Sequence, residues 1–314
     1  MNKLERAALE ADLAAVQALL RQRTPEEDPI GWMHFQARAK ENEQRLQAIA
    51  AEMDTTASVA LFFGGRPVIG SRGIDADFGG KALEHFQNAV SIQLAALQGT
   101  VGARGPIPLR AHSQLLVTDV ARGSIGFVLE EAQPESQLID TQLKSALDGV
   151  VDTIHRIGSP DEDAFEAAVD AVDNRVLASV KAFFKLIDEA GATLRVVEGA
   201  RDFSLQRESI EIARKRVDDL EIDEDTIERT GTFYLLPDSR RFELHLFDGG
   251  VLRGTLSTDV SEQLIDAGGI PQRGIIGSVS TVRLTRRKIT TRRREPRFSY
   301  KLIEFRGPDR PAHP

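Results

Sequence analysis

Apolar residues recur at helical spacing from the start of the chain. Leu9, Leu13, Val16 and Leu20 follow one another in steps of four, three and four, which keeps them on one face of a helix. This pattern predicts a first helix over 3–22. The stripe is narrow, so the helix needs a second surface to cover it.

A second helical pattern follows a proline-flanked break at 24–29 and predicts a helix over 32–53. Its expected apolar contacts are Phe35, Leu46, Ile49 and Met53. Residues 1–53 are therefore interpreted as a helical hairpin. Such a hairpin either packs onto the domain that follows it or serves as a dimerisation arm.

Residues 54–200 mix short apolar strands with long helical patterns, which is typical of an α+β domain. A Gly-Gly-Arg-Pro turn at 64–67 follows the first strand and predicts a returning strand that begins at Val68-Ile69. Strands are expected at 59–63, 115–117, 126–129 and 193–197, and helices at 78–98, 136–157 and 160–190. The result is a small antiparallel sheet backed by helices.

A charged segment over 201–224 is interpreted as a connector helix, and the domain that follows it covers 225–305. Strands are expected there at 226–236, 241–247, 251–256, 277–287 and 297–305, with a short helix at 259–267 between the third and fourth. This order is typical of a five-stranded OB-like barrel, and an SH3-like barrel is the close alternative. The proline-bearing tail, 306–314, is expected to be disordered.

Charge is distributed very unevenly along the chain. Residues 281–301 hold nine Lys or Arg and a single acid, Glu295, although the 314-residue chain carries a net charge of −8. A positive segment on an acidic body is a plausible footprint for a phosphate backbone. The balance over 225–305 is more modest, with 14 basic and 10 acidic residues.

The candidate binding residues come from this segment and from the strands of the predicted barrel. The run from Arg286 to Arg294 is expected at the hairpin between strands four and five, where loops of OB folds contact oligonucleotides. Tyr234 and Phe247 are the aromatic residues expected on the outer surface, since Phe242, Leu244 and Leu246 share the inner face. The basic candidates are Arg283, Arg286, Arg287, Lys288, Arg292, Arg293, Arg294 and Arg297.

Several kinds of chemistry have no support in the sequence. The chain has no cysteine, which excludes disulfides, cysteine nucleophiles and thiolate metal sites. Its six histidines form no local zinc motif, and neither a P-loop nor a GxSxG elbow is present. No metal or cofactor is expected, although an active site assembled from distant residues stays open.

These observations predict a non-enzymatic, cytoplasmic binding or adaptor protein that contacts nucleic acid, with weak sequence preference, through the basic hairpin. The alternative is a protein–protein interaction subunit of a larger complex without nucleic-acid contact. A homo-oligomer held by helices from 3–53 and 136–190 is expected, because these regions carry much apolar helical surface. No membrane association is expected, since no run of about 18 apolar residues occurs.

Overall fold

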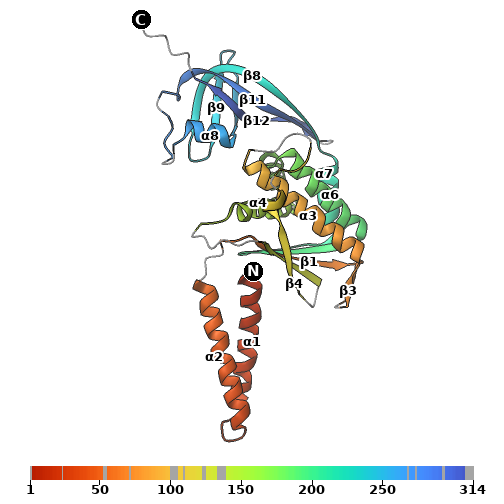
Figure 1. Ribbon diagram of the computed structural model, residues 1–314. Coiled ribbons are helices and arrows are strands. Elements are labelled where there is room, and N and C mark those ends of the chain that lie inside the picture. Colours follow the sequence, from red (N-terminus) through yellow and green to blue (C-terminus); the bar gives the residue numbers. More distant parts are fainter. Residues whose placement is uncertain are drawn as a thin grey trace. The chain divides into compact units, whose positions relative to one another are not determined.

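The computed structural model divides the chain into two compact units (Figure 1). Unit 1 comprises Met1–Leu94, Leu109–Val169 and Arg175–Arg214, and unit 2 comprises Ala95–Pro108, Asp170–Asn174 and Lys215–Pro314. The structure describes residues 2–22, 24–51, 55–70, 72–99, 105–108, 110–121, 125–132, 139–266, 269–272, 274–291 and 294–307. The predicted tail lies almost wholly outside these ranges.

The N-terminal hairpin consists of α1 (Asn2–Gln22) and α2 (Pro29–Ala51). Its least exposed positions on α2 follow a three-four spacing, as in a coiled-coil seam. They are Trp32, Phe35, Ala39, Asn42 and Leu46. On α1 the predicted stripe includes Val16, which is 2% exposed. The two helices therefore cover each other's narrow stripes.

A polar cluster lies within this seam and aligns the two helices. Asp12 on α1 accepts a hydrogen bond from the Asn42 side-chain amide at 2.7 Å and two from the Arg38 guanidinium at 2.6 and 2.8 Å. A polar residue inside an apolar seam favours one alignment, because any shift would leave it buried without its partner.

The core of unit 1 is a five-stranded antiparallel sheet with the order β4-β5-β1-β6-β7. Its strands are β1 (Ser58–Gly65), β4 (Leu115–Ala121), β5 (Ile125–Glu131), β6 (Ala192–Glu198) and β7 (Arg201–Leu205). The prediction that Val68-Ile69 returns alongside the first strand is wrong. That segment, β2 (Val68–Ile69), pairs only with β3 (Gly73–Ile74), because β1 already has β5 and β6 on its two sides.

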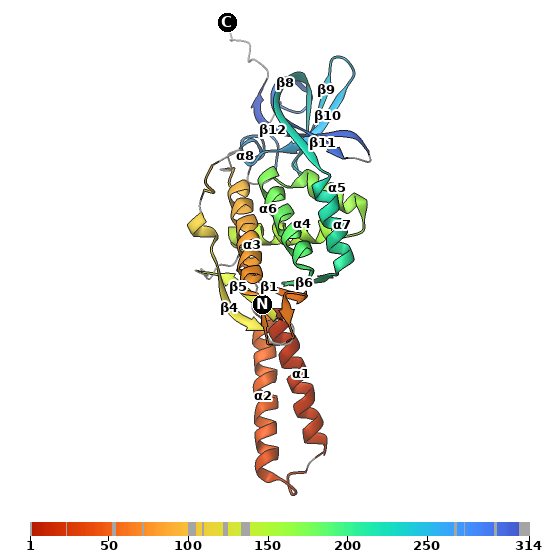
Figure 2. The ribbon, with the colours of Figure 1, turned by 90° about the vertical axis from the view of Figure 1, so that its right-hand side faces the viewer.

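Helices cover one face of this sheet (Figure 2). The helices between the N-terminal hairpin and the barrel are α3 (Ala76–Leu97), α4 (Gln142–Gly158), α5 (Glu162–Ala171), α6 (Asn174–Ala190) and α7 (Arg207–Asp218), and a short 3-10 turn, η1, lies at Arg110–Ser113. The long helix expected over 160–190 is interrupted at Val172 and Asp173. Of the connector helix expected over 201–224, the part in α7 (Arg207–Asp218) is helical, whereas its start is strand β7 and its end belongs to a long strand that begins at Glu221.

The apolar faces of the long helices are buried inside unit 1. Val150, Ile154, Val180, Phe184 and Ile187 are each at most 1% exposed. The apolar surface of 136–190, which motivated the prediction of an oligomer, is therefore satisfied within one chain over the residues described. The apolar surface of these helices therefore gives no reason to expect an oligomer.

The C-terminal region forms a closed five-stranded barrel with the order β10-β12-β11-β8-β9. Its elements are β8 (Glu221–Leu236), β9 (Arg241–Leu246), β10 (Val251–Leu256), α8 (Thr258–Leu264), β11 (Ser278–Thr291) and β12 (Arg294–Arg306). The third and fifth strands, β10 and β12, pair in parallel. The predicted α+β class with a C-terminal five-stranded barrel is confirmed.

The barrel core is continuous and contains two stacked rings, Phe233 and Phe242, whose centroids lie 6.0 Å apart. Val282, Leu284 and Leu302 close the core from β11 and β12 with no exposed surface. The sequence placed the barrel correctly because period-2 alternation and hairpin turns are strong local signals. The strands β8 and β11 are longer than expected, and they form a ribbon that runs past the residues of the core.

Candidate binding surfaces of the barrel unit

The basic part of β11 lies directly beside the acidic part of β8. Both strands are antiparallel, so residues at matching register positions present their side chains on the same face. The charged register pairs are Arg283 with Glu228, Arg286 with Asp225, Arg287 with Glu224, and Lys288 with Asp223. Much of the positive charge that stands out in the sequence is therefore opposed by carboxylates of the neighbouring strand.

Arg286 shows this pairing most clearly. Its Nε donates to Asp225 Oδ1 at 2.9 Å and its Nη2 donates to Asp225 Oδ2 at 2.5 Å. These hydrogen bonds lower the pKa of Asp225 and raise the pKa of Arg286. Arg283 similarly donates to Glu304 on β12 at 3.4 Å. Both arginines lie in strand β11, and both are engaged by acids of the same unit.

Arg287 is buried, which contradicts its expected place in an exposed hairpin. Its guanidinium donates to the Val172 carbonyl oxygen at 3.0 Å and to Asn174 Oδ1 at 2.6 Å. Burial lowers the pKa of this guanidinium. Arg297 on β12 donates to Asp170 at 2.6 Å. One face of the ribbon is thus packed against the segment Asp170–Asn174, which belongs to the same unit.

The opposite face of the ribbon is more open. Lys288 is exposed, and Phe298 across from it on β12 is 49% exposed. The Arg286 guanidinium carbon lies 5.7 Å from the centroid of the Phe298 ring. Phe298 was not among the sequence candidates, because only the strand register reveals that it shares a face with Lys288. Arg292, Arg293 and the Arg294 side chain lie outside the described residues.

The two aromatic candidates of the barrel are on its outer surface. Tyr234 is 38% exposed and Phe247 is 74% exposed. The Tyr234 ring contacts the ring of His245, with centroids 4.8 Å apart. The register adds two valines: His245 pairs with Val251 on β10 and with Thr232 on β8, which in turn pairs with Val279 on β11.

We call this surface the outer barrel face and define it by Thr232, Tyr234, Glu243, His245, Val251, Arg253 and Val279, together with Phe247, which directly follows β9. Its charges are balanced. Glu243 accepts a hydrogen bond from Arg253 Nε at 2.8 Å and lies 3.3 Å from His245 Nε2. Val251 and Val279 are 41% and 50% exposed. The sequence candidates include neither the valines nor His245, although the alternation of Glu243 and His245 with Phe242 and Leu244 already places His245 on the outer face.

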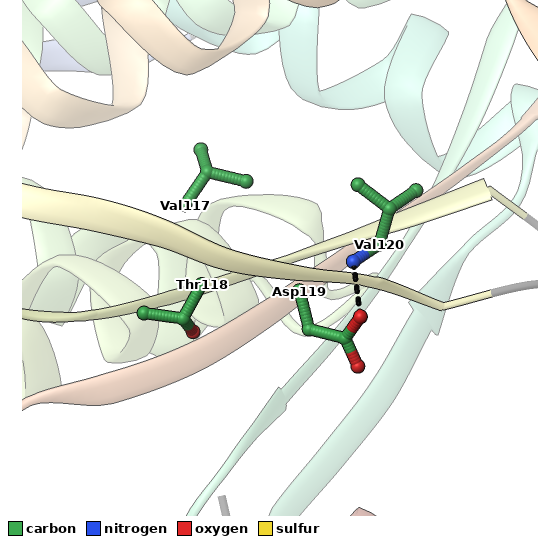
Figure 3. Close-up of a pocket in the computed structure, with 4 residues that line it drawn as sticks. All are labelled: Val117, Thr118, Asp119 and Val120. Atoms are coloured by element: carbon green, nitrogen blue, oxygen red, sulfur yellow. Dashed lines mark hydrogen bonds between the residues drawn. The ribbon is translucent and has the colours of Figure 1, made fainter.

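A shallow hollow lies beside the edge strand β4 of unit 1, as Figure 3 shows. Val117, Thr118, Asp119 and Val120 line it, and Asp119 accepts a hydrogen bond from the backbone amide of Val120 at 2.7 Å. All four residues come from a single strand. The hollow therefore lacks the converging polar groups from several elements that typify an active site.

Among the residues that the structure describes, no three His, Cys, Asp or Glu side chains gather closely enough to hold a metal ion. None of the described helices is long and apolar enough to cross a membrane. A scan against models of known protein families found no match, and searches of curated proteins and of solved structures found none either. The ribbon and the outer barrel face are therefore the features from which a function can be inferred.

Proposed function

We propose that this chain is a non-enzymatic adaptor that docks another protein on the outer barrel face. The observation that carries the proposal is the exposure of Phe247, Val251 and Val279 around the Tyr234–His245 ring contact. Protein interfaces are enriched in aromatic residues and depleted of unpaired charge at their centre. The expected partner is a protein with an apolar surface that accommodates Phe247 as the central anchor.

The charges of the barrel unit favour this alternative over nucleic acid. Oligonucleotide affinity comes mainly from cations that are available to neutralise phosphates. Arg283, Arg286 and Arg297 instead pair with acids of their own unit, and Arg287 is buried. A phosphate would have to displace Asp225 or Glu304 to reach two of them.

Single-stranded nucleic acid is the second candidate ligand, and a specific observation favours it. Tyr234 lies on β8 and Phe247 directly follows β9, the first two strands of an OB-like barrel, and folds of this type stack unpaired bases on exposed aromatics. Phe298 beside Lys288 would extend such a surface. Binding of this kind would depend more on stacking than on charge, so its salt dependence would be shallow.

A photo-crosslinking amino acid at position 247, in the full chain expressed in its native cells, tests the proposal. We expect a discrete protein adduct that disappears when Tyr234→Ser or Val251→Ser is added. The matched control places the same amino acid at Ile212 of α7, which is 47% exposed and lies outside the barrel unit. No adduct is expected there.

Titration of the purified chain with single- and double-stranded oligonucleotides at 50 mM salt separates the two candidates. The adaptor proposal expects no binding in either titration. Single-strand binding that is lost in Phe247→Ser, together with no protein adduct at position 247, would replace it with the nucleic-acid alternative. The compartment predicted for either function remains the cytoplasm.

A further inference from the structure

Two carboxyl side chains meet in unit 1 between the end of β6 and α4. Glu198 is the last residue of β6 and is only 6% exposed. Asp148 lies in α4, and its side chain contacts that of Glu198. The Asp148 Oδ1 atom is fully buried and has no hydrogen-bond donor among the described residues. A buried carboxylate oxygen without a donor is costly, so Asp148 Oδ1 requires an explanation.

One guanidinium serves this pair. Arg201 Nη1 donates to Glu198 Oε2 at 3.0 Å and to the Asp148 backbone carbonyl at 3.3 Å. It therefore compensates Glu198, whereas its bond to Asp148 is to the backbone carbonyl and does not reach Oδ1 of the carboxylate. The nearby charges Arg195 and Asp202 bond to each other at 2.9 and 3.0 Å.

We propose that Glu198 and Asp148 form a proton-operated latch that fastens the β6–β7 hairpin to α4. When Glu198 is protonated, its hydroxyl donates to Asp148, and both carboxyl groups are satisfied with one negative charge between them. When the proton leaves, two like charges remain in contact and share one arginine. Repulsion then separates the hairpin from the helix.

Glu198 is expected to lose its proton, and the latch to open, near neutral pH. Burial, together with the neighbouring Asp148, raises the pKa of Glu198 from 4.5 to about 7, against the opposing effect of Arg201. With that value, roughly three quarters of the molecules hold the proton at pH 6.5 and roughly one quarter at pH 7.5. The folded-state pKa lies above the unfolded one, so this contribution to stability is fully present below pH 4.5. It is lost as the pH rises through about 7.

The strand β7 is the element that the latch controls. It is an edge strand of the sheet, and it pairs only with β6. Its first residue, Arg201, is paired with Glu198 across the hairpin, so loss of the latch acts on β7 directly. Edge strands with few partners open at low cost. Opening would release Arg201–Ser204 without unfolding the rest of the sheet, because Leu205 is buried beside Gly158 of α4.

A carbon-13 NMR titration of the side-chain carboxyl groups in the full chain tests the proposal, with Glu198→Gln and Asp148→Asn used for assignment. We expect one carboxyl of the pair to titrate near pH 7. Hydrogen exchange, corrected for the intrinsic pH effect, should show the protection of β7 amides falling roughly tenfold between pH 6 and pH 8. Glu198→Gln should remove this dependence, because its amide donates at every pH.

Asp202→Asn is the matched control, since it removes a carboxylate of the same hairpin that pairs with Arg195 outside the latch. It should leave the pH profile of β7 unchanged. The proposal is overturned if both carboxyls titrate below pH 5. It is equally overturned if β7 protection in the unsubstituted chain stays constant from pH 6 to pH 8. These two measurements use the native sequence, so they decide even if a variant fails to fold.

Discussion

Arg286 on β11 holds Asp225 on β8 through two parallel hydrogen bonds of 2.9 and 2.5 Å. This single relationship changes the meaning of the most basic segment of the chain. In the sequence the two residues stand 61 positions apart, and their charges belong to different segments. In the barrel they are register neighbours, so the positive segment and the acidic start of β8 neutralise each other.

Removing the acids that face the ribbon cations should expose latent positive charge. We expect Asp223→Asn combined with Asp225→Asn to bind an oligonucleotide more tightly at 50 mM salt than the unsubstituted protein does. With Arg286 and Lys288 released, the affinity should fall by about tenfold on raising salt to 200 mM, as for two phosphate contacts. Fluorescence anisotropy with a labelled single strand measures both effects.

The control for this experiment is Glu262→Gln on α8, which also removes negative charge but lies away from the ribbon in sequence and register. It should leave oligonucleotide binding unchanged. Steep salt dependence in the unsubstituted protein, near the thousandfold expected for about six contacts, would mean that the ribbon arginines are available to phosphates after all.

Arg287 should behave as a core residue rather than as a binding residue. Arg287→Leu leaves the Val172 carbonyl and Asn174 without their donor, so we expect a loss of about 1–3 kcal/mol in unfolding free energy. Urea denaturation followed by far-UV circular dichroism measures it. Lys288→Leu, at the next position and exposed, should have no measurable effect. Equal stability of both variants would contradict the buried role of Arg287.

Asn42 is expected to lower the stability of the N-terminal hairpin while it fixes the alignment of the two helices. Asn42→Leu removes the hydrogen bond to Asp12 and adds apolar surface to the seam, so we expect slower hydrogen exchange in α1 and α2. The same change should yield mixed oligomers by light scattering, because the alignment is no longer specified. Asn42→Ala removes the hydrogen bond without adding surface and should only accelerate exchange. A uniform monomer for Asn42→Leu would refute the alignment role.

The sequence supports predictions wherever the signal is local. Period-2 alternation around Phe242 and Leu244 identifies the barrel strands, and the spacing from Leu9 to Leu20 identifies the hairpin. Turn residues at 237–240 and 248–250 mark the hairpins between the first three strands. These features depend on residues within one or two turns of each other, so a single chain suffices to read them.

The partners of charged residues are not local, and this is where prediction from the sequence fails. Arg287 and Val172 are separated by 115 positions, so no pattern in 281–301 distinguishes the buried arginine from its exposed neighbour Lys288. Glu198 and Asp148 likewise meet only once β6 has packed against α4. The prediction of a returning strand at Val68-Ile69 is wrong for the same reason. The strands β5 and β6, which come from distant segments, occupy both sides of β1.

Closure of the barrel should depend on the absence of a side chain at Gly254. A Cβ built at this position collides with the Tyr300 carbonyl oxygen of β12 and approaches the Phe242 ring. Backbone cannot yield as a flexible side chain would, so Gly254→Ala must push β10 away from β12. We expect a loss of about 1–3 kcal/mol in unfolding free energy and faster exchange of amides in β10 and β12.

Gly80→Ala is the matched control, because Gly80 is exposed in α3 and its Cβ would meet nothing within 4 Å. That variant should be more stable by about 0.5–1 kcal/mol, since alanine favours a helix interior. If Gly254→Ala matched the unsubstituted protein in both measurements, the close approach of β10 and β12 would not hold in solution.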